Sequence, residues 1–309
     1  NTFSIGGQPF GLFYAAGASW RVSNESFLKN TSWLEELKFR ISYGHSGNDD
    51  IGETNASRFY SSLRYRETTG LFPAIKSNDE LTFETIDQLN AGVDFSVLGS
   101  RISTKVDVYQ STSSNLLIYS PIDSYFGYNY QPDNSGKMQN MGIDANVFIR
   151  VIDFANFKWD LQANYSIVRN EILEIGGDKI VEQVQGAEIA NIVGGQANSF
   201  YGYRFEGVYA STADAESRGY VNNKAMPYSA GDAIYEDISG PDGVPDKVID
   251  QYDKDFIGSP IPDHFGGINS RLSYKRWMLE VFVYGVGGNE VFNYVRYRNE
   301  SMSGLQNQS

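Results

Sequence analysis

The most regular feature of the chain is the alternation of apolar and polar residues over stretches of about ten residues. The segment 141–151 reads M-G-I-D-A-N-V-F-I-R-V, so its odd positions are apolar and its even positions are polar or small, apart from Phe148. The segment 159–167, W-D-L-Q-A-N-Y-S-I, repeats the pattern. Successive side chains of a β-strand point to opposite faces. We therefore predict two strands, each with one apolar and one polar face.

The same alternation recurs along most of the chain and predicts further strands. These segments are 12–22, 37–43, 89–95, 102–108, 264–274 and 277–283. The pattern thus predicts an all-β protein with about eight or nine such strands. An apolar face on every strand requires a partner, which is either a protein core or a lipid bilayer.

The lengths of the links favour the bilayer. Short links at 97–100, 153–157 and 275–276 alternate with long links at 46–81, 120–137 and 174–263. An up-and-down barrel in a membrane has short turns on one side and long loops on the other. A soluble sandwich would instead show turn signals about every 8–12 residues. We therefore expect an antiparallel transmembrane β-barrel. The remaining link, 23–34, is expected to hold a helical turn at 30–36, capped by Thr31 or Ser32.

Tryptophan positions agree with this orientation. Trp20, Trp33, Trp159 and Trp277 all lie near the ends of the strands that meet the short links. Membrane barrels carry girdles of aromatic residues at both interfaces with water. The alternative is that large aromatic residues simply cap a β core.

Composition narrows the function. The net charge of −13 argues against nucleic-acid binding, which needs clustered Lys and Arg. The chain has no cysteine, so disulfides and thiolate metal sites are excluded. Its two histidines leave little for a catalytic triad or a zinc site. It contains no phosphate-binding loop, dinucleotide fingerprint, nucleophile elbow or zinc signature. We expect no enzymatic chemistry in this chain.

Several sequence blocks resemble one family. These are W-R-V-S-N-E-S-F at 20–27, L-K-F-R-I-S-Y-G-H-S-G-N at 37–48, N-A-G-V-D-F at 90–95, N-M-G-I-D at 140–144, F-Y-G-Y at 200–203 and I-G-S-P at 257–260. Their order is similar to that of the SusC/RagA-like TonB-dependent outer-membrane transporters of Bacteroidetes. The resemblance covers nearly the whole chain, and the shared order of the blocks is more specific than any single block.

This resemblance implies a large plugged barrel in the bacterial outer membrane that imports glycan or peptide fragments. It also implies energy from the TonB complex, contact with membrane lipid and a SusD-like surface lipoprotein as partner. A plugged barrel of this kind has about 22 strands. Residues 1–309 are therefore expected to be a partial TonB-dependent receptor-like barrel segment, with the plug domain and TonB box outside this chain. Alternatives are an intact small pore or adhesin barrel, a siderophore-type receptor, or a soluble glycan-active β protein.

Two groups of loop residues are candidates for substrate binding. One lies in the link 120–137 and the other in the link 46–81; the residues are Tyr125, Phe126, Tyr128, Tyr130, Tyr60, Arg64, Tyr65 and Arg66. Aromatic faces stack on sugar rings. The alternative is packing against each other or against a partner lid, because Tyr and Arg are enriched at protein interfaces.

An acidic segment is a candidate calcium site. Its oxygen-bearing residues are Asp237, Ser239, Asp242, Asp246 and Asp250. Calcium takes several oxygen ligands on a flexible loop, although Pro241 interrupts EF-hand spacing. The alternative is a solvated acidic turn held by Asx hydrogen bonds. We expect that no cofactor is required; calcium in this external loop is a candidate ion only.

Charged residues on the polar sides of the strands are expected to line a wet interior. They are Arg21, Lys38, Arg40, Lys105, Asp107, Asp144, Arg150, Asp160 and Arg271.

Overall fold

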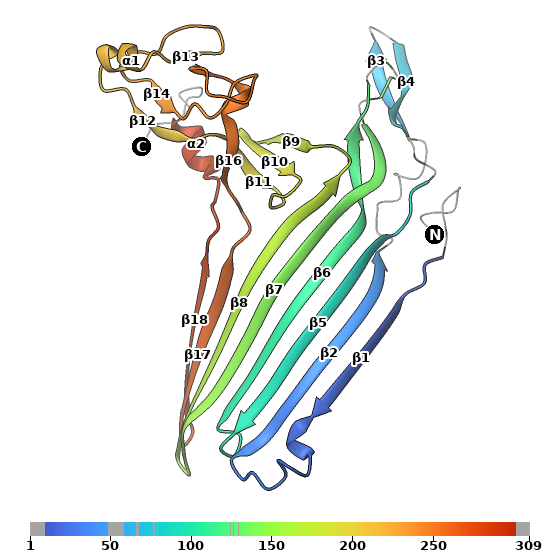
Figure 1. The fold of residues 1–309 in the computed structure, drawn as a ribbon, viewed down its shortest axis with the longest axis vertical. Helices are drawn as coiled ribbons and strands as arrows, with labels where there is room; N and C mark the ends of the chain where they lie inside the picture. Colours follow the sequence, from blue (N-terminus) through green and yellow to red (C-terminus); the bar gives the residue numbers. More distant parts are fainter. Residues whose placement is uncertain are drawn as a thin grey trace. The chain divides into compact units, whose positions relative to one another are not determined.

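An eight-stranded antiparallel sheet dominates the computed structural model (Figure 1). The structure describes residues 10–48, 59–65, 68–76, 78, 80–123, 125, 127–128 and 130–300. In spatial order, the strands are β1 Tyr14–Arg21, β2 Leu34–Asn48, β5 Glu84–Val97, β6 Ile102–Pro121, β7 Tyr130–Phe154, β8 Phe157–Ile175, β17 His264–Tyr274 and β18 Trp277–Gly287. Each strand contains most or all of one segment with the predicted alternation. The predicted fold class is therefore confirmed.

Several strands are longer than the alternation suggested. β6 continues past Val108 to Pro121, and β7 begins at Tyr130. The extra residues of β6 include S-T-S-S-N at 111–115, where polar residues occupy both faces and the alternation disappears. The predicted helical turn at 30–36 is wrong, because Leu34 already pairs with Val97. A 3₁₀ turn lies earlier, at Val22–Asn24, and Glu25 N donates to Val22 O at 3.0 Å.

The register sorts the side chains into rows that run across the sheet. One row joins β1 to β8 through Ala18, Ile41, Ala91, Val108, Ile143 and Ile167. A row on the opposite face joins the same strands through Arg21, Lys38, Asp94, Lys105, Asn146 and Asn164. The sheet therefore has one apolar face and one polar face from strand to strand.

The apolar face is exposed in this structure. Ile41 keeps 53% of its accessible surface, Val108 keeps 52% and Leu279 keeps 58%. A continuous apolar surface of this kind marks contact with a partner or a membrane. Trp20, Trp33, Trp159 and Trp277 stand at the sheet end that carries the short turns, as the sequence predicted. No described helix has the length and apolar character needed to cross a membrane.

The two outer strands leave the sheet open. β1 pairs only with β2, and β18 pairs only with β17, among the residues that the structure describes. A separate hairpin, β3 Phe59–Tyr65 and β4 Thr68–Ile75, lies in the first long link. These elements form one of two compact units, together with residues 192–195.

Among the described residues, the second unit contains 179–191, 196–261 and 289–300. Its four-stranded sheet has the order β16 Lys254–Gly258, β11 Ser199–Tyr203, β10 Ala187–Ile192 and β9 Lys179–Val184. Two ribbons pair β12 Phe205–Val208 with β14 Ala233–Tyr235, and β13 Val221–Asn222 with β15 Val248–Ile249. The helices are α1 Thr212–Arg218, α2 Tyr294–Glu300 and the 3₁₀ turn η3 Gln251–Asp253. Most of this structure lies within the predicted long link 174–263.

A small core holds part of the second unit together. Tyr209 is 2% exposed and packs with Ala215 and Ile234. The rings of Tyr209 and Tyr228 stack with centroids 5.8 Å apart, and burial raises the pKa of both phenols. Ser211 caps α1 by accepting a hydrogen bond from Asp214 N, and Gly219 ends the helix with φ of 68°.

Candidate functional site

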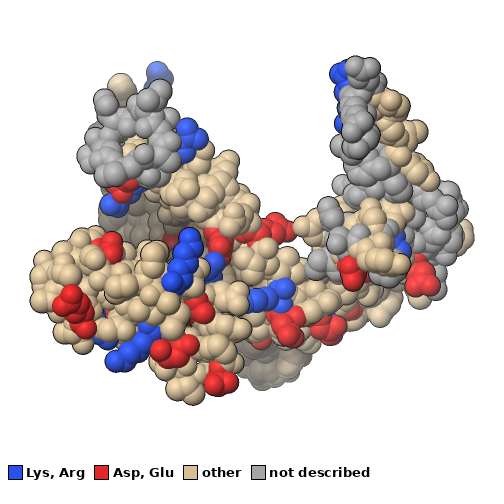
Figure 2. All heavy atoms as spheres, turned by 90° about the horizontal axis from the view of Figure 1, so that it is seen from above, with Lys and Arg blue, Asp and Glu red and all other residues tan. Residues whose placement is uncertain are grey.

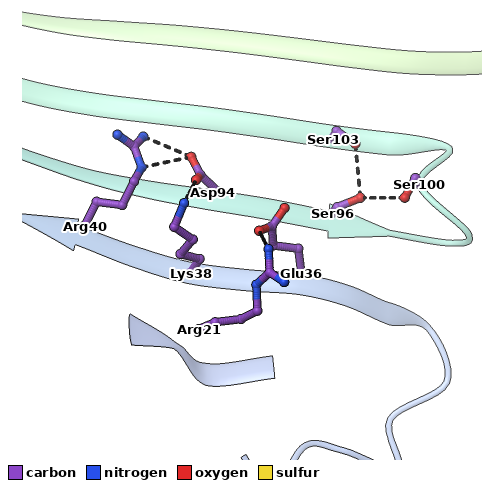
Figure 3. Close-up of polar contacts among 8 residues, drawn as sticks. All are labelled: Arg21, Glu36, Lys38, Arg40, Asp94, Ser96, Ser100 and Ser103. Atoms are coloured by element: carbon purple, nitrogen blue, oxygen red, sulfur yellow. Dashed lines mark hydrogen bonds and ion pairs between the residues drawn. The ribbon is translucent and has the colours of Figure 1, made fainter. Parts of the chain in front are cut away.

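The polar face of the eight-stranded sheet carries a cluster of ion pairs. Arg40 Nη2 lies 2.9 Å from Asp94 Oδ1 and 3.0 Å from Asp107 Oδ2. Lys38 Nζ lies 3.2 Å from the second oxygen of Asp94 (Figure 3). The Asp94 side chain retains only 10% of its exposure. Two cations from β2 therefore hold a largely buried carboxylate of β5 and connect it to β6.

Gly92 makes this connection possible. It lies between Arg40 on β2 and Asp107 on β6 in the strand register. A Cβ atom at Gly92 would lie 2.7 Å from Arg40 Nη2 and would overlap Asp107. The missing side chain leaves the space through which the guanidinium crosses β5.

Further polar contacts extend across the same face. Arg21 pairs with Glu36 at 2.7 Å, as Figure 3 also shows, and Arg150 pairs with Asp160 at 3.0 Å. Arg271 pairs with Glu280 at 3.0 Å. Fixed charges of both signs therefore cover this face, and they suit a surface in contact with water or polar groups.

All the charged residues predicted to line a wet interior lie on this face. They fall in three rows: Arg21, Lys38 and Lys105; Arg40, Asp107 and Asp144; and Arg150, Asp160 and Arg271. Asp107 and Asp144 stand directly opposite each other on β6 and β7. Like charges in this position destabilise a sheet. Arg40 compensates the first carboxylate, and the Ser166 hydroxyl donates to the second at 2.6 Å.

The two long links that carry the predicted aromatic groups are joined by hydrogen bonds. Lys76 N, just after β4, donates to Tyr130 O at the start of β7 at 3.4 Å. The Asn78 side-chain amide donates to Pro132 O at 3.0 Å, and Asn134 Oδ1 accepts from Thr82 N at 2.8 Å. This junction could not be predicted from the sequence, because it depends on backbone groups and on side-chain amides far apart in the chain.

The structure places several candidate substrate residues at the surface. Tyr125 is 90% exposed, Tyr60 is 54% exposed and Tyr130 is 52% exposed. Arg64 is also exposed, and Tyr128 is half-buried. Phe126 and Arg66 lie outside the described residues, as does the side chain of Tyr65. Substrate contact by this group stays a prediction.

Backbone amides occupy much of the acidic loop's hydrogen-bonding capacity. Asp237 accepts from Lys247 N at 2.7 Å, Asp246 accepts from Val248 N at 2.9 Å and Asp250 accepts from Tyr252 N at 2.9 Å. The Ser239 hydroxyl donates to Gly240 O at 3.2 Å, while Asp242 is exposed. In the described part of the chain, no three carboxylate or histidine groups converge as a metal site would require. Such contacts are those expected for an acidic turn held by Asx hydrogen bonds. Calcium binding stays a prediction.

Asp253, which the sequence did not single out, holds this loop from inside. It is fully buried, and Oδ1 accepts from Ile238 N at 2.8 Å and from Ser239 N at 3.2 Å. Oδ2 accepts from Asp250 N at 2.8 Å and completes a capping box on η3. The capping spacing D-x-x-D at 250–253 was the available signal.

The second unit also contains a cavity of about 450 Å³. Phe200, Gly202, Ile257 and Phe292 contribute to its lining. Beside it, Lys254 Nζ contacts Glu188 at 2.7 Å. Its volume is in the range of small-ligand sites, which are mostly apolar with a few polar groups. In Figure 2, acidic and basic side chains of the described residues are interspersed.

Comparison with known proteins supports the resemblance found in the sequence. The family described as TonB dependent receptor-like, beta-barrel matches residues 2–308. TonB-dependent receptor P26 of Formosa agariphila is 31% identical over 93% of this chain and 29% of its own length. TonB-dependent receptor SusC of Bacteroides thetaiotaomicron is 27% identical over 87% of this chain and 26% of its own length.

Solved structures show the same similarity in three dimensions. The chain superposes on the structure of the RagAB peptide transporter with a TM-score of 0.76 and 25% identity. The match covers 95% of this chain and 31% of the chain in that structure. The chain therefore spans less than a third of the proteins it matches.

Proposed function

The chain belongs to the TonB dependent receptor-like β-barrel family of the outer membrane, and on this premise we propose that it forms part of a transporter wall. The transporter imports oligosaccharide or peptide fragments with energy from the TonB complex. The observation that carries this proposal is the two-faced sheet. Its apolar rows suit lipid, and its paired charges suit a polar passage or a domain inside the barrel.

A SusD-like surface lipoprotein is the proposed partner. SusC is among the relatives, and the matched structure is that of RagAB, a peptide transporter. Exposed aromatic residues on the long-link side provide groups of the kind enriched at protein interfaces. Purification of the full-length protein in mild detergent should retain a surface lipoprotein. Recovery of the intact transporter without any such lipoprotein would contradict the proposed partnership.

The substrate is proposed to contact the long loops. The candidates are the residues around Tyr125 and Tyr130, and those on the β3 hairpin, including Tyr60 and Arg64. Aromatic rings offer large apolar faces with a polar edge, which suits both sugar rings and peptide side chains. Tyr60, Tyr125 and Tyr130 each keep more than half of their accessible surface.

Uptake by cells that carry the full-length protein tests this role. Tyr125→Ala with Tyr130→Ala should raise the half-saturating concentration of labelled oligosaccharide or peptide by about tenfold, as expected for lost stacking contacts. Tyr274→Ala is the matched control, because Tyr274 is 51% exposed, close to the 52% of Tyr130, but stands at the short-turn end. Equal uptake by all variants would remove these tyrosines from the substrate path. Comparison of the uptake of labelled oligosaccharides with that of labelled peptides identifies the substrate class.

A further inference from the structure

The apolar face of the sheet contains a hollow of about 370 Å³. It lies over the central strands β5 to β8, away from both open edges. Its apolar lining is formed by Leu89, Ala91, Val108, Met141, Ile143 and Ile167. Ala91 stands in a row with isoleucines and a valine, and its short side chain leaves room above β5.

One end of the hollow is polar. Gln110 and Arg169 also line the hollow, together with Tyr109 and Gly142. Gln110 and Arg169 lie in one row with Leu89 and Met141. The next row toward the long links contains Asp87, Thr112, Gln139 and Glu171. Arg169 therefore stands where the apolar band of the sheet ends. Lipid headgroups contact a membrane barrel at such a boundary of its apolar band.

The Arg169 guanidinium is exposed and has no ion pair among the described residues. The nearest acidic residue on its own strand and face is Glu171, two residues further on, which is also exposed. Asp87, the other carboxylate of that row, is engaged by the Tyr43 hydroxyl at 2.5 Å and by His45 at 2.9 Å. An arginine placed beside an apolar hollow has its five donors available for an anion.

We propose that this hollow is a binding site for a phosphate-bearing acyl lipid of the leaflet on the long-link side. One acyl chain fills the hollow, and Arg169 binds the phosphate. Apolar burial alone gives no preference here, because the surrounding lipid is equally apolar. The preference comes from close packing of the chain in the hollow and from charge-assisted hydrogen bonds between guanidinium and phosphate. A purely apolar occupant would leave the charge uncompensated.

Lipid binding to the full-length protein in a non-ionic detergent tests the site. Native mass spectrometry counts the lipids retained after titration with phosphatidylglycerol, or with a galactosyl diacylglycerol of the same acyl chains. We expect one phosphatidylglycerol per wild-type molecule. Arg169→Gln should weaken its retention by about tenfold and leave the neutral lipid unchanged, because only the phosphate contact is lost. Ala91→Leu fills the hollow and should weaken retention of both lipids.

Ala18→Leu is the matched control. Ala18 is exposed in the same row as Ala91 but lies on β1, outside the hollow. This variant should retain lipid like the wild type. Equal retention by Ala91→Leu and Ala18→Leu would overturn the proposed hollow. An equal effect of Arg169→Gln on both lipids would overturn the phosphate contact. Uptake measurements on the same variants report the transport role separately, so a failure here leaves the proposed function standing.

Discussion

At Gly92, a missing side chain decides whether Arg40 can reach Asp107. Gly92→Ala places a methyl group 2.7 Å from Arg40 Nη2, so the guanidinium must leave and Asp107 faces Asp144 without its cation. We expect the free energy of unfolding to fall by about 1–3 kcal/mol, the usual range for overpacking. Urea titration of the full-length protein in lipid vesicles measures this change.

Gly44→Ala is the control for this experiment. Gly44 lies on the same face of β2, and a Cβ atom there would meet only Ala15 Cβ at 3.8 Å, an ordinary contact. Its free energy of unfolding should stay within about 0.5 kcal/mol of the wild type. Equal losses in both variants would mean that glycine in a strand, and not the path of Arg40, explains the effect.

Asp253 has a comparable role in the acidic loop. Asp253→Asn replaces one of two accepting oxygens with an NH₂ group, so either Asp250 N or the Ile238 and Ser239 amides lose their partner. An unsatisfied buried group costs about 1–3 kcal/mol. We expect faster amide hydrogen exchange across 237–253, with Asp242→Asn, at an exposed position, behaving like the wild type.

Chelation separates this explanation from the calcium prediction. If the loop is held by backbone amides that donate to carboxylates, its exchange rates should be the same with and without EDTA. The accepting carboxylates are those of Asp237, Asp246, Asp250 and Asp253. A loop held by calcium should exchange faster after chelation, and calorimetric titration with calcium should then give less heat in Asp242→Ala.

At the scale of elements, the long strands were predictable and the small ones were not. In a strand such as β17, His264–Tyr274, apolar and polar residues alternate from Ile268 onward apart from Ser270, and the predicted bounds match the structure. The elements of the second unit are short: β13 is Val221–Asn222 and β14 is Ala233–Tyr235. Segments of this length contain too few residues to show a period of two. They are fixed by contacts such as Tyr209 on Tyr228 and by buried Asp253, which depend on residues far apart in the chain.

The candidate site was also predictable only in part. The charges of the polar face follow from strand alternation alone, so the sequence placed Lys38 and Arg40 correctly. It did not show that Arg40 bridges two strands, because this contact depends on the register that brings Gly92 between Arg40 and Asp107. The junction of Lys76 with Tyr130 was equally hidden, since a backbone hydrogen bond has no residue signature.

Alternation along β2 predicts a measurable pattern. The chain has no cysteine, so single substitutions Ile41→Cys, Ser42→Cys, Tyr43→Cys and Gly44→Cys can each carry a spin label. Collisions with oxygen, which concentrates in lipid, should be frequent at 41 and 43 and rare at 42 and 44. Lys275→Cys in the short turn should instead collide mainly with a water-soluble nickel complex. Equal oxygen accessibility at all four β2 positions would contradict a lipid-facing apolar row.

For the whole molecule, the decisive feature is that the sheet has two open edges. β1 and β18 present unpaired backbone groups among the described residues, and such groups cannot stay unpaired in lipid. In an intact small barrel, β1 and β18 would pair with each other. In a segment of a larger barrel, each would pair with other strands of the same protein, as the match to less than a third of each relative suggests.

Cross-linking in native outer membranes distinguishes these two arrangements. Leu272→Cys with Leu279→Cys joins registered partners on β17 and β18 and should form a disulfide under oxidation, because such partners lie within reach of the bond. Ala16→Cys or Ala18→Cys combined with Val281→Cys or Val283→Cys should not, because other strands separate β1 from β18. Gel mobility of the full-length protein with and without reductant reports both results. An intramolecular bond between β1 and β18 would show a closed small barrel and would overturn the wall-segment proposal. Its absence, beside an efficient β17–β18 bond, requires that further strands complete the wall on both sides.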